Sequence, residues 1–259
     1  MSYITLQRSG KTGVITFSNP RRRNALCAQL CDEIAQALAE LASEKMTTVI
    51  LRAEKNAVIW SAGHDVNELP VNDKDPLAYD APMEKMFHAI ERYPGVVIAM
   101  IQGSVWGGAC DMAMTCDIIV ADKTATFAIT PVKIGLPYNP SGILHFRNRV
   151  GLGFAKEMFF TAKPIPAERA YQTGIINHCV EADEIESYTM EMADGINQNS
   201  ALAIAVIKEQ MRILFRATPI SPDTFEHIEQ LRRKVYTSRD YKEGIKSFLE
   251  KRKPDFKGE

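Results

Sequence analysis

The chain has 259 residues, of which 46% are hydrophobic, so it is long enough to bury a full core. Its 31 lysine and arginine residues balance 32 aspartate and glutamate residues, which argues against nucleic acid or an anionic membrane as the main partner. No stretch approaches the ~20 apolar residues of a membrane span, and the N-terminus lacks the pattern of a signal peptide. We therefore expect a soluble, cytoplasmic protein.

The five cysteines are an odd number and include no Cys-x-x-Cys pair. Cys27 and Cys31 would share a helix face, as half of a metal site does, but no second half is evident in the sequence. Free cysteines usually pack as small hydrophobic residues. We expect buried thiols in a reducing compartment, and no metal site.

The first third of the chain predicts strands and one long helix. Tyr3–Leu6 and Gly13–Phe17 are typical of two short strands joined by a turn. Asn24 is a candidate N-cap, because Leu26 and the apolar residues after it recur at helical spacing. The apolar segment Thr48–Arg52 predicts a buried parallel strand, and Ala53–Gly63 predicts a loop.

The middle of the chain continues this alternation of strands and helices. Residues 70–82 are polar and rich in proline, which predicts a mobile surface loop before a helix over Met83–Tyr93. The strand Val96–Ile101 runs into a glycine-rich turn, and strands follow at Ile118–Val120 and Thr126–Ile129. The alternation predicts an α/β fold built on a parallel sheet.

Helical patterns dominate after about residue 143, and Ile175–Val180 is the one late strand that we expect. We place a soft domain boundary near residue 200. Residues 1–200 would form the core with the site, and 201–259 a helical region for contacts between subunits. Such a small group of helices must pack on the main body or on another subunit.

Two small-residue turns predict a place where negative charge is stabilised. Gly107-Gly108 opens a helix directly after a strand and a turn, so backbone N–H groups and the positive helix end point at one spot. The run Ser61-Ala62-Gly63 precedes His64 about 40 residues earlier. If both turns follow neighbouring parallel strands, two N–H groups would lie side by side as an oxyanion hole.

The motifs Trp60–Val66 and Gly103–Ala109, together with Asn24-Ala25-Leu26 and Gly174–Asn177, resemble the crotonase (enoyl-CoA hydratase/isomerase) superfamily over essentially the whole chain. The resemblance implies a spiral of ββα repeats with a C-terminal helical appendage, and a homotrimer or dimer of trimers. It also implies acyl-CoA thioester substrates, whose enolate oxygen would bind the backbone N–H groups of His64 and Gly108. No metal and no cofactor is expected, since coenzyme A is part of the substrate.

The family resemblance also bears on the reaction. In hydratases of this family two glutamates activate water; their positions fall here on Asp111 and Pro131, and proline cannot transfer a proton. The run Thr130–Asn139 is instead similar to family members that decarboxylate methylmalonyl-CoA to propionyl-CoA and CO₂. Tyr138 would then bind the leaving carboxylate. Asp111 departs from that pattern, where glutamate is expected, and its role and the proton donor to the enolate stay open.

The resemblance assigns substrate contacts to Ala62, Gly63, His64, Asp65, Val66, Gly108, Thr130 and Lys251, with Lys251 on the nucleotide. Arg21-Arg22-Arg23 is a candidate for the phosphate groups, although charge runs are more often solvated loops. We interpret the other histidines, including His145, as structural or exposed. Two alternatives remain: an enoyl-CoA hydratase or isomerase that uses Asp111, and a non-catalytic oligomer that binds CoA esters.

Overall fold

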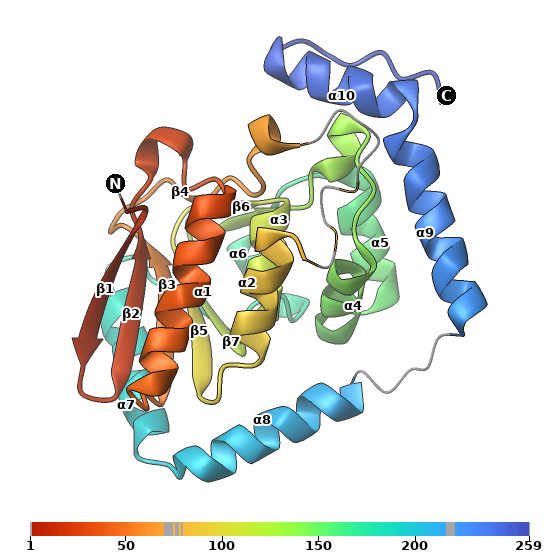
Figure 1. Cartoon of the computed structure of the whole chain (residues 1–259). Helices are drawn as coiled ribbons and strands as arrows, with labels where there is room; N and C mark the ends of the chain where they lie inside the picture. The colour runs from red at the N-terminus through yellow and green to blue at the C-terminus, as the bar shows by residue number, and fades with distance from the viewer. Residues whose placement is uncertain (1, 70–74, 76–77, 79, 216–220, 259) are drawn as a thin grey trace.

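The computed structural model describes residues 2–69, 75, 78, 80–215 and 221–258, and its main feature is a largely parallel sheet covered by helices (Figure 1). All neighbours in this sheet run parallel except the first two strands, which form an antiparallel hairpin. The predicted parallel sheet is therefore confirmed. From edge to edge its strands are β1 (Ile4–Ser9), β2 (Thr12–Phe17), β3 (Thr48–Ala53), β5 (Val96–Ile101), β7 (Ile118–Asp122) and β10 (His178–Val180).

A second, smaller sheet was not predicted. Its strands β4 and β6 fall in segments that we expected to be loop and turn, because three residues are too short to show an alternating pattern. Each follows a strand of the main sheet and precedes a helix, so β3-β4-α2 and β5-β6-α3 are successive ββα units. The strands of the second sheet are β4 (Ile59–Ser61), β6 (Ser104–Trp106), β8 (Thr126–Ala128) and β9 (Ile165–Pro166).

Both faces of the main sheet are covered. Alternating side chains divide between them: Ile15 and Leu51 belong to the large core under the first helices, whereas Val14 and Ile50 pack on the helix that contains Ile185. The two faces therefore carry two separate cores. The helices of the first core are α1 (Ala28–Ser43), α2 (Pro82–Glu91), α3 (Gly108–Thr115), α4 (Pro140–Arg149), α5 (Leu152–Thr161) and α6 (Ala167–Gln172), and that of the second is α7 (Ile185–Asn197).

Asn24 is not the N-cap of α1, contrary to the prediction. The helix begins only at Ala28, and Asn24 has a left-handed backbone with a φ of 49°. Its side chain instead donates to the Trp60 carbonyl oxygen at 3.1 Å and accepts a hydrogen bond from the Asn19 N–H at 2.9 Å. Asn24 thus fastens the loop before α1 to β4.

The C-terminal helices are α8 (Ala201–Phe215), α9 (Pro222–Tyr236) and α10 (Arg239–Leu249). Figure 1 shows α8 along one end of the body and α10 at the opposite end. α10 packs closely on the 3₁₀ helix η3 (Pro131–Ile134): a Cβ atom on Gly244 would lie only 2.1 Å from the Ile134 carbonyl oxygen. The last helix therefore supports the segment that carries Pro131.

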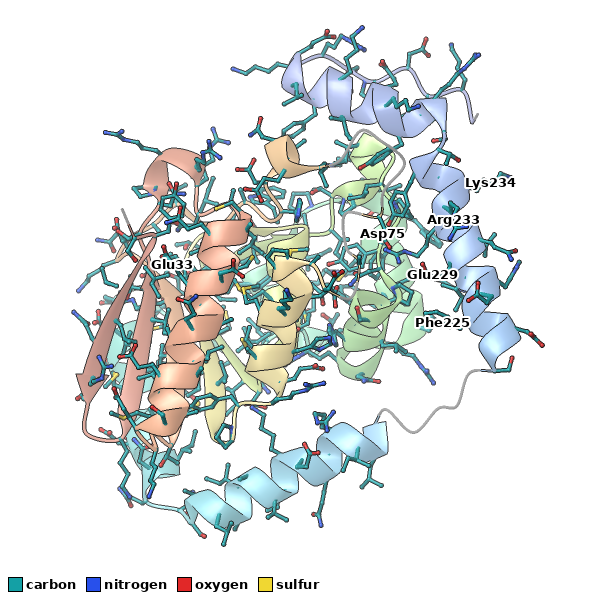
Figure 2. The ribbon with its side chains drawn as sticks, in the orientation of Figure 1. Glu33, Asp75, Phe225, Glu229, Arg233 and Lys234 are labelled. Carbon is teal, nitrogen blue, oxygen red and sulfur yellow. The ribbon has the colours of Figure 1, made fainter. Side chains whose placement is uncertain are left out.

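Most of the loop predicted at 70–82 lies outside the described residues, but Asp75 is described. It forms an ion pair with Arg232 of α9 at 2.6 Å, and Glu229 reaches the same guanidinium at 3.1 Å. Figure 2 shows Asp75 beside α9, the helix that carries Glu229. No helix among the described residues is both long and apolar enough to cross a membrane.

Candidate active site

Two backbone N–H groups meet where β4 and β6 end. The two strands are parallel neighbours, with Ser61 opposite Val105, so the turns that follow them emerge side by side. A Cβ atom on Gly108 would lie 3.5 Å from the His64 nitrogen. Among the described residues neither the His64 nor the Gly108 N–H has a hydrogen-bond acceptor. The pair can therefore receive an oxygen from a bound molecule.

Gly63 permits this close approach. Its φ is +81°, a conformation that L side chains rarely adopt, and a Cβ atom there would lie 2.3 Å from the Trp106 carbonyl oxygen. The same atom would lie 3.1 Å from the Gly108 nitrogen. Only glycine at this position lets the two turns come together.

A pocket opens beside the two N–H groups. It brings together five residues that the sequence singled out: His64, Gly108, Asp111, Pro131 and Tyr138. Burial lowers the pKa of the His64 imidazole, which is therefore neutral at physiological pH. The rest of the wall is mainly apolar and consists of Leu69, Met83, Leu136, Pro137 and Asn139.

Tyr138 is held by aromatic packing. Its ring makes edge-to-face contacts with Phe159 at 4.9 Å and Phe146 at 6.1 Å between centroids, and its hydroxyl donates to the Gly107 carbonyl oxygen at 3.3 Å. Desolvation, reinforced by the charge of Asp111, keeps the pKa of the phenol well above its usual range. Tyr138 is thus a neutral hydrogen-bond donor beside the two N–H groups.

The other predicted contact residues lie around or away from this pocket. Thr130 lies next to the turn, since its Oγ1 would be 3.5 Å from a Cβ atom on Gly107. Asp65 is buried and pairs with Arg22 at 2.7 Å, so one of the three candidate arginines fixes the loop after His64. Ala62 and Val66 flank that loop, whereas Lys251 is exposed in the tail after α10 and does not line the pocket.

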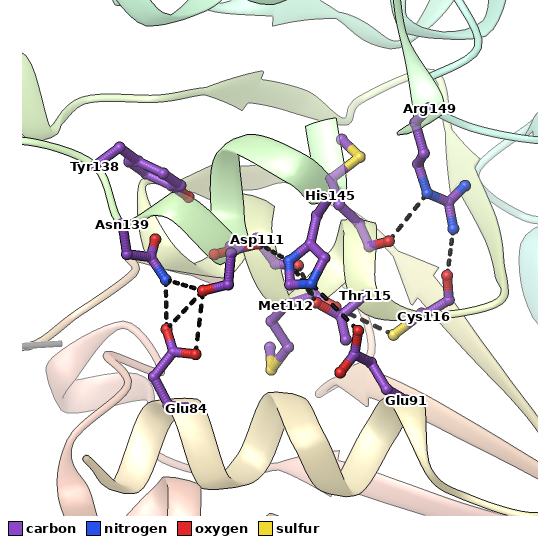
Figure 3. Close-up of polar contacts among 12 residues, drawn as sticks. Glu84, Glu91, Asp111, Met112, Thr115, Cys116, Tyr138, Asn139, His145 and Arg149 are labelled. Atoms are coloured by element: carbon purple, nitrogen blue, oxygen red, sulfur yellow. Dashed lines mark hydrogen bonds and ion pairs between the residues drawn. The ribbon is translucent and has the colours of Figure 1, made fainter. Parts of the chain in front are cut away.

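Sequence reasoning missed a buried polar network behind the pocket (Figure 3). Asp111 Oδ1 lies 2.6 Å from His145 Nδ1, and His145 Nε2 lies 3.3 Å from Glu91 Oε1. Glu84 accepts hydrogen bonds from Asn139 Nδ2 and, at 3.2 Å, from Ser141 Oγ. His145 is therefore a partner of Asp111, which no spacing along the chain indicates, because α2, α3 and α4 meet only in the folded protein.

A second cavity, of about 510 Å³, lies on the other face of the main sheet and is a weaker candidate for a catalytic site. Its charged side chains are already paired: Arg52 with Glu186 at 3.0 Å, and Arg8 with Glu44 at 2.7 Å. In the part of the chain that the structure describes, no three His, Cys, Asp or Glu side chains group as metal ligands. The pocket beside Gly108 is therefore the candidate active site.

Comparisons with known proteins agree on one family. The family model for enoyl-CoA hydratase/isomerase matches residues 7–259. Methylmalonyl-CoA decarboxylase of Escherichia coli K12 is 45% identical, over 99% of this chain and 98% of that protein, whereas a short-chain-enoyl-CoA hydratase of Clostridium acetobutylicum is 28% identical over 98% and 97%.

A solved structure gives the same result. The structure of methylmalonyl-CoA decarboxylase in complex with 2-nitronate-propionyl-CoA superposes with a TM-score of 0.98 at 45% identity, and covers 100% of this chain and 99% of its own. The predicted α/β spiral is thereby confirmed.

Proposed function

The chain belongs to the enoyl-CoA hydratase/isomerase family, and on that premise we propose that it decarboxylates methylmalonyl-CoA to propionyl-CoA and CO₂. One observation carries the proposal: 45% identity to a methylmalonyl-CoA decarboxylase over 99% of the chain. The pocket supports it as well, because the N–H groups of His64 and Gly108 and the neutral hydroxyl of Tyr138 line one mainly apolar pocket. The protein is accordingly a lyase that acts on CoA thioesters.

The backbone N–H groups of His64 and Gly108 stabilise the enolate. As the bond between C2 and the carboxylate breaks, its electrons move into the thioester, and negative charge develops on the thioester oxygen. Donors that are already in place cost no reorganisation, and one such donor is typically worth about 3 to 4 kcal/mol in the transition state. The reaction needs no metal or separate cofactor, because the thioester itself accepts the electrons.

Tyr138 holds the leaving carboxylate. Its hydroxyl, which binds the Gly107 carbonyl oxygen, turns to the carboxylate and keeps the breaking bond perpendicular to the thioester plane. The apolar side chains of Leu69, Met83 and Leu136 form the wall nearby, and CO₂ is better accommodated there than a carboxylate.

The hydratase alternative has less support. Pro131 lines the pocket where a second acid–base residue would be needed, and it carries no proton. Asp111 alone is left to handle protons, whereas the hydratases of this family use two carboxyl groups. The hydratase from Clostridium acetobutylicum is also more distant, at 28% identity.

The remaining contacts extend the same proposal. The 62–66 segment binds the pantetheine and adenine end of coenzyme A through its backbone, and Thr130 positions the acyl group. Lys251, exposed beyond α10, reaches the nucleotide phosphates. The five unpaired cysteines support a cytoplasmic location, since thiols persist in reducing compartments.

Assembly into a homotrimer, or a dimer of trimers, is part of the proposal. Six apolar side chains of α8 are about half exposed or more: Leu202, Val206, Ile207, Met211, Ile213 and Leu214. A single chain leaves this surface in water, and contact with another subunit would bury it.

CO₂ release from a panel of CoA esters tests the function. The purified protein should release CO₂ from methylmalonyl-CoA faster than it hydrates crotonyl-CoA. Tyr138→Phe, which keeps the ring but removes the hydroxyl, should lower kcat by about tenfold to hundredfold, the cost of one hydrogen bond to a charged group.

Two results would contradict the proposal. Crotonyl-CoA turnover above decarboxylation, abolished in Asp111→Ala, would favour the hydratase. Binding of CoA esters without any turnover would favour the non-catalytic oligomer.

A further inference from the structure

A chain of three largely buried side chains leads away from the pocket. Asp111 is only 1% exposed, lines the pocket and contacts His145 Nδ1 at 2.6 Å through Oδ1. The other ring nitrogen of His145 lies 3.3 Å from Glu91, whose side chain is 13% exposed. Figure 3 shows His145 between the two carboxylates, which come from α3 and α2.

We propose that the Asp111–His145–Glu91 chain supplies the proton that the product enolate takes up, with His145 acting through Asp111. The proposal rests on the proposed function in that it needs an enolate in this pocket. It names the donor for the step that follows loss of CO₂. Asp111 touches the substrate, and His145 holds and renews its proton.

The second oxygen of Asp111 and the ring of Tyr138 both lie close to Gly142. A Cβ atom on Gly142 would lie 2.5 Å from Asp111 Oδ2 and 2.3 Å from Tyr138 Cε1. Gly142 therefore leaves the space in which the carboxyl group and the tyrosine ring share the same wall. The group that binds the leaving carboxylate and the group that supplies the proton are thus adjacent.

His145 is charged at neutral pH. Burial alone would lower its pKa, but the Asp111 charge and the hydrogen bonds to Asp111 and Glu91 raise it to about 10. Glu84 faces the same cluster, and His88 and Arg212 act on it through Glu91. The resting unit is therefore an imidazolium between carboxylates, with one proton to give.

The proton balance closes without any further reactant. The C2–carboxylate bond breaks, CO₂ leaves, and the electron pair passes into the thioester enolate. His145 gives its Nδ1 proton to Asp111 Oδ1, the carboxylic acid so formed turns about its Cβ–Cγ bond, and it donates that proton to C2. Nε2 keeps its proton toward Glu91 throughout, and water that enters the pocket after the product leaves returns the Nδ1 proton through Asp111. Each turnover consumes one proton from solvent, and nothing is oxidised or reduced.

The competing explanation is that His145 has only a structural role, as a hydrogen-bond donor to the buried Asp111 carboxylate. Exchange of the C2 hydrogens of propionyl-CoA with D₂O distinguishes the two, because exchange runs the protonation step in reverse. In reverse, the unit must start with neutral His145, whose fraction rises about tenfold per pH unit below its pKa. A purely structural histidine would impose no such dependence.

The experiment measures deuterium incorporation into propionyl-CoA by mass spectrometry between pH 6 and 9, with the rate without enzyme subtracted. The native protein should exchange about a hundredfold faster at pH 9 than at pH 7. In His145→Gln, which keeps a donor to Asp111 but cannot pass a proton, the rate should not depend on pH. His178→Gln is the matched control, since His178 pairs with Tyr188 at 2.8 Å outside the pocket and its loss should leave the profile unchanged.

Three results would each overturn the proposal. The protein could release CO₂ without exchanging deuterium, its exchange rate could be independent of pH, or His145→Gln could keep the pH dependence of the native protein. If His145→Gln does not fold, Glu91→Gln is measured in its place. Loss of the Glu91 charge should lower the pKa of His145 and so move the pH dependence of exchange to lower pH. An unchanged pH dependence would contradict the proposed role of these three residues. Exchange with the expected profile but no CO₂ release would refute the proposed function alone.

Discussion

Glu84 is a carboxyl group held in an unusual environment within the candidate site. It is 4% exposed, and burial, with the nearby Asp111 charge, raises its pKa to about 7. Asn139 and Ser141 donate hydrogen bonds to it, so its oxygens are satisfied even though its charge is disfavoured. Near neutral pH this residue therefore changes charge behind the pocket.

This shift makes stability depend on pH. Because the pKa in the folded state lies above the ordinary value of 4.5, the folded protein keeps a proton that the unfolded chain has lost. Stability should therefore fall as pH rises from about 4.5 to 7. In Glu84→Gln the loss in free energy of unfolding between pH 5 and pH 8 should be smaller than in the native protein by about 2 kcal/mol.

Urea denaturation at the two pH values measures this difference. Glu54→Gln, at an exposed glutamate, is the control and should retain the native dependence. An unchanged pH dependence in Glu84→Gln would show that Glu84 is ionised throughout.

At the level of elements, the proposed oxyanion hole depends on two neighbouring strands. β4 and β6 are three residues each, yet their parallel pairing sets the distance between the turns that follow them. Gly63 is the point where these turns touch. The two donors are therefore in place before a substrate arrives.

Gly63→Ala should separate the two turns. The added methyl group would meet the Trp106 carbonyl oxygen at 2.3 Å, and the positive φ would be strained. Misplacing one donor should lower kcat by about a hundredfold or more. Steady-state kinetics on material shown to be folded by circular dichroism measures the effect. Gly153→Ala is the control, because no atom lies within 4 Å of its added carbon, and equal activity in the two variants would refute this account.

The sequence revealed the site only where the chemistry is local. The residues of Trp60–Val66 and Gly103–Ala109 are contiguous, so the motif and its family could be recognised without the fold. The second sheet could not, because its strands are as short as turns. Nor could His145, since its contact with Asp111 joins α3 to α4 across 34 residues. Asn24 was misread because its side chain binds the distant Trp60 carbonyl group rather than the helix beside it.

At the level of the whole molecule, the main feature is the exposed apolar surface of α8. Lys208 anchors this helix, donating to the Gly95 carbonyl oxygen at 3.1 Å and to Asp117 at 2.7 Å. Its apolar side chains stay exposed all the same: Ile207 is 51% and Leu214 72% exposed. The polar anchor thus fixes the helix to its own chain while its apolar side chains remain exposed, as the proposed contact between subunits requires.

Ile207→Asp should therefore disrupt assembly. A charge in the buried part of an interface has no partner and is costly to desolvate. Light scattering should give three or six times 28.9 kDa for the native protein, and a smaller species for the variant. Val58→Asp, at a side chain that is 82% exposed on a loop, is the control and should leave the mass unchanged. A native monomer would refute the assembly.

The packing of α10 on η3 also determines when the enzyme can become active during its synthesis. Domains form from the N-terminus onward as the chain emerges from the ribosome, and the strands of both sheets precede α7. Ile134, however, packs against α10 only after the chain has been synthesised as far as Gly244. In a nascent chain the two turns of the proposed oxyanion hole can thus be formed while the segment of Pro131 and Tyr138 is still without its contact to α10. Activity should therefore begin only after release of the finished chain.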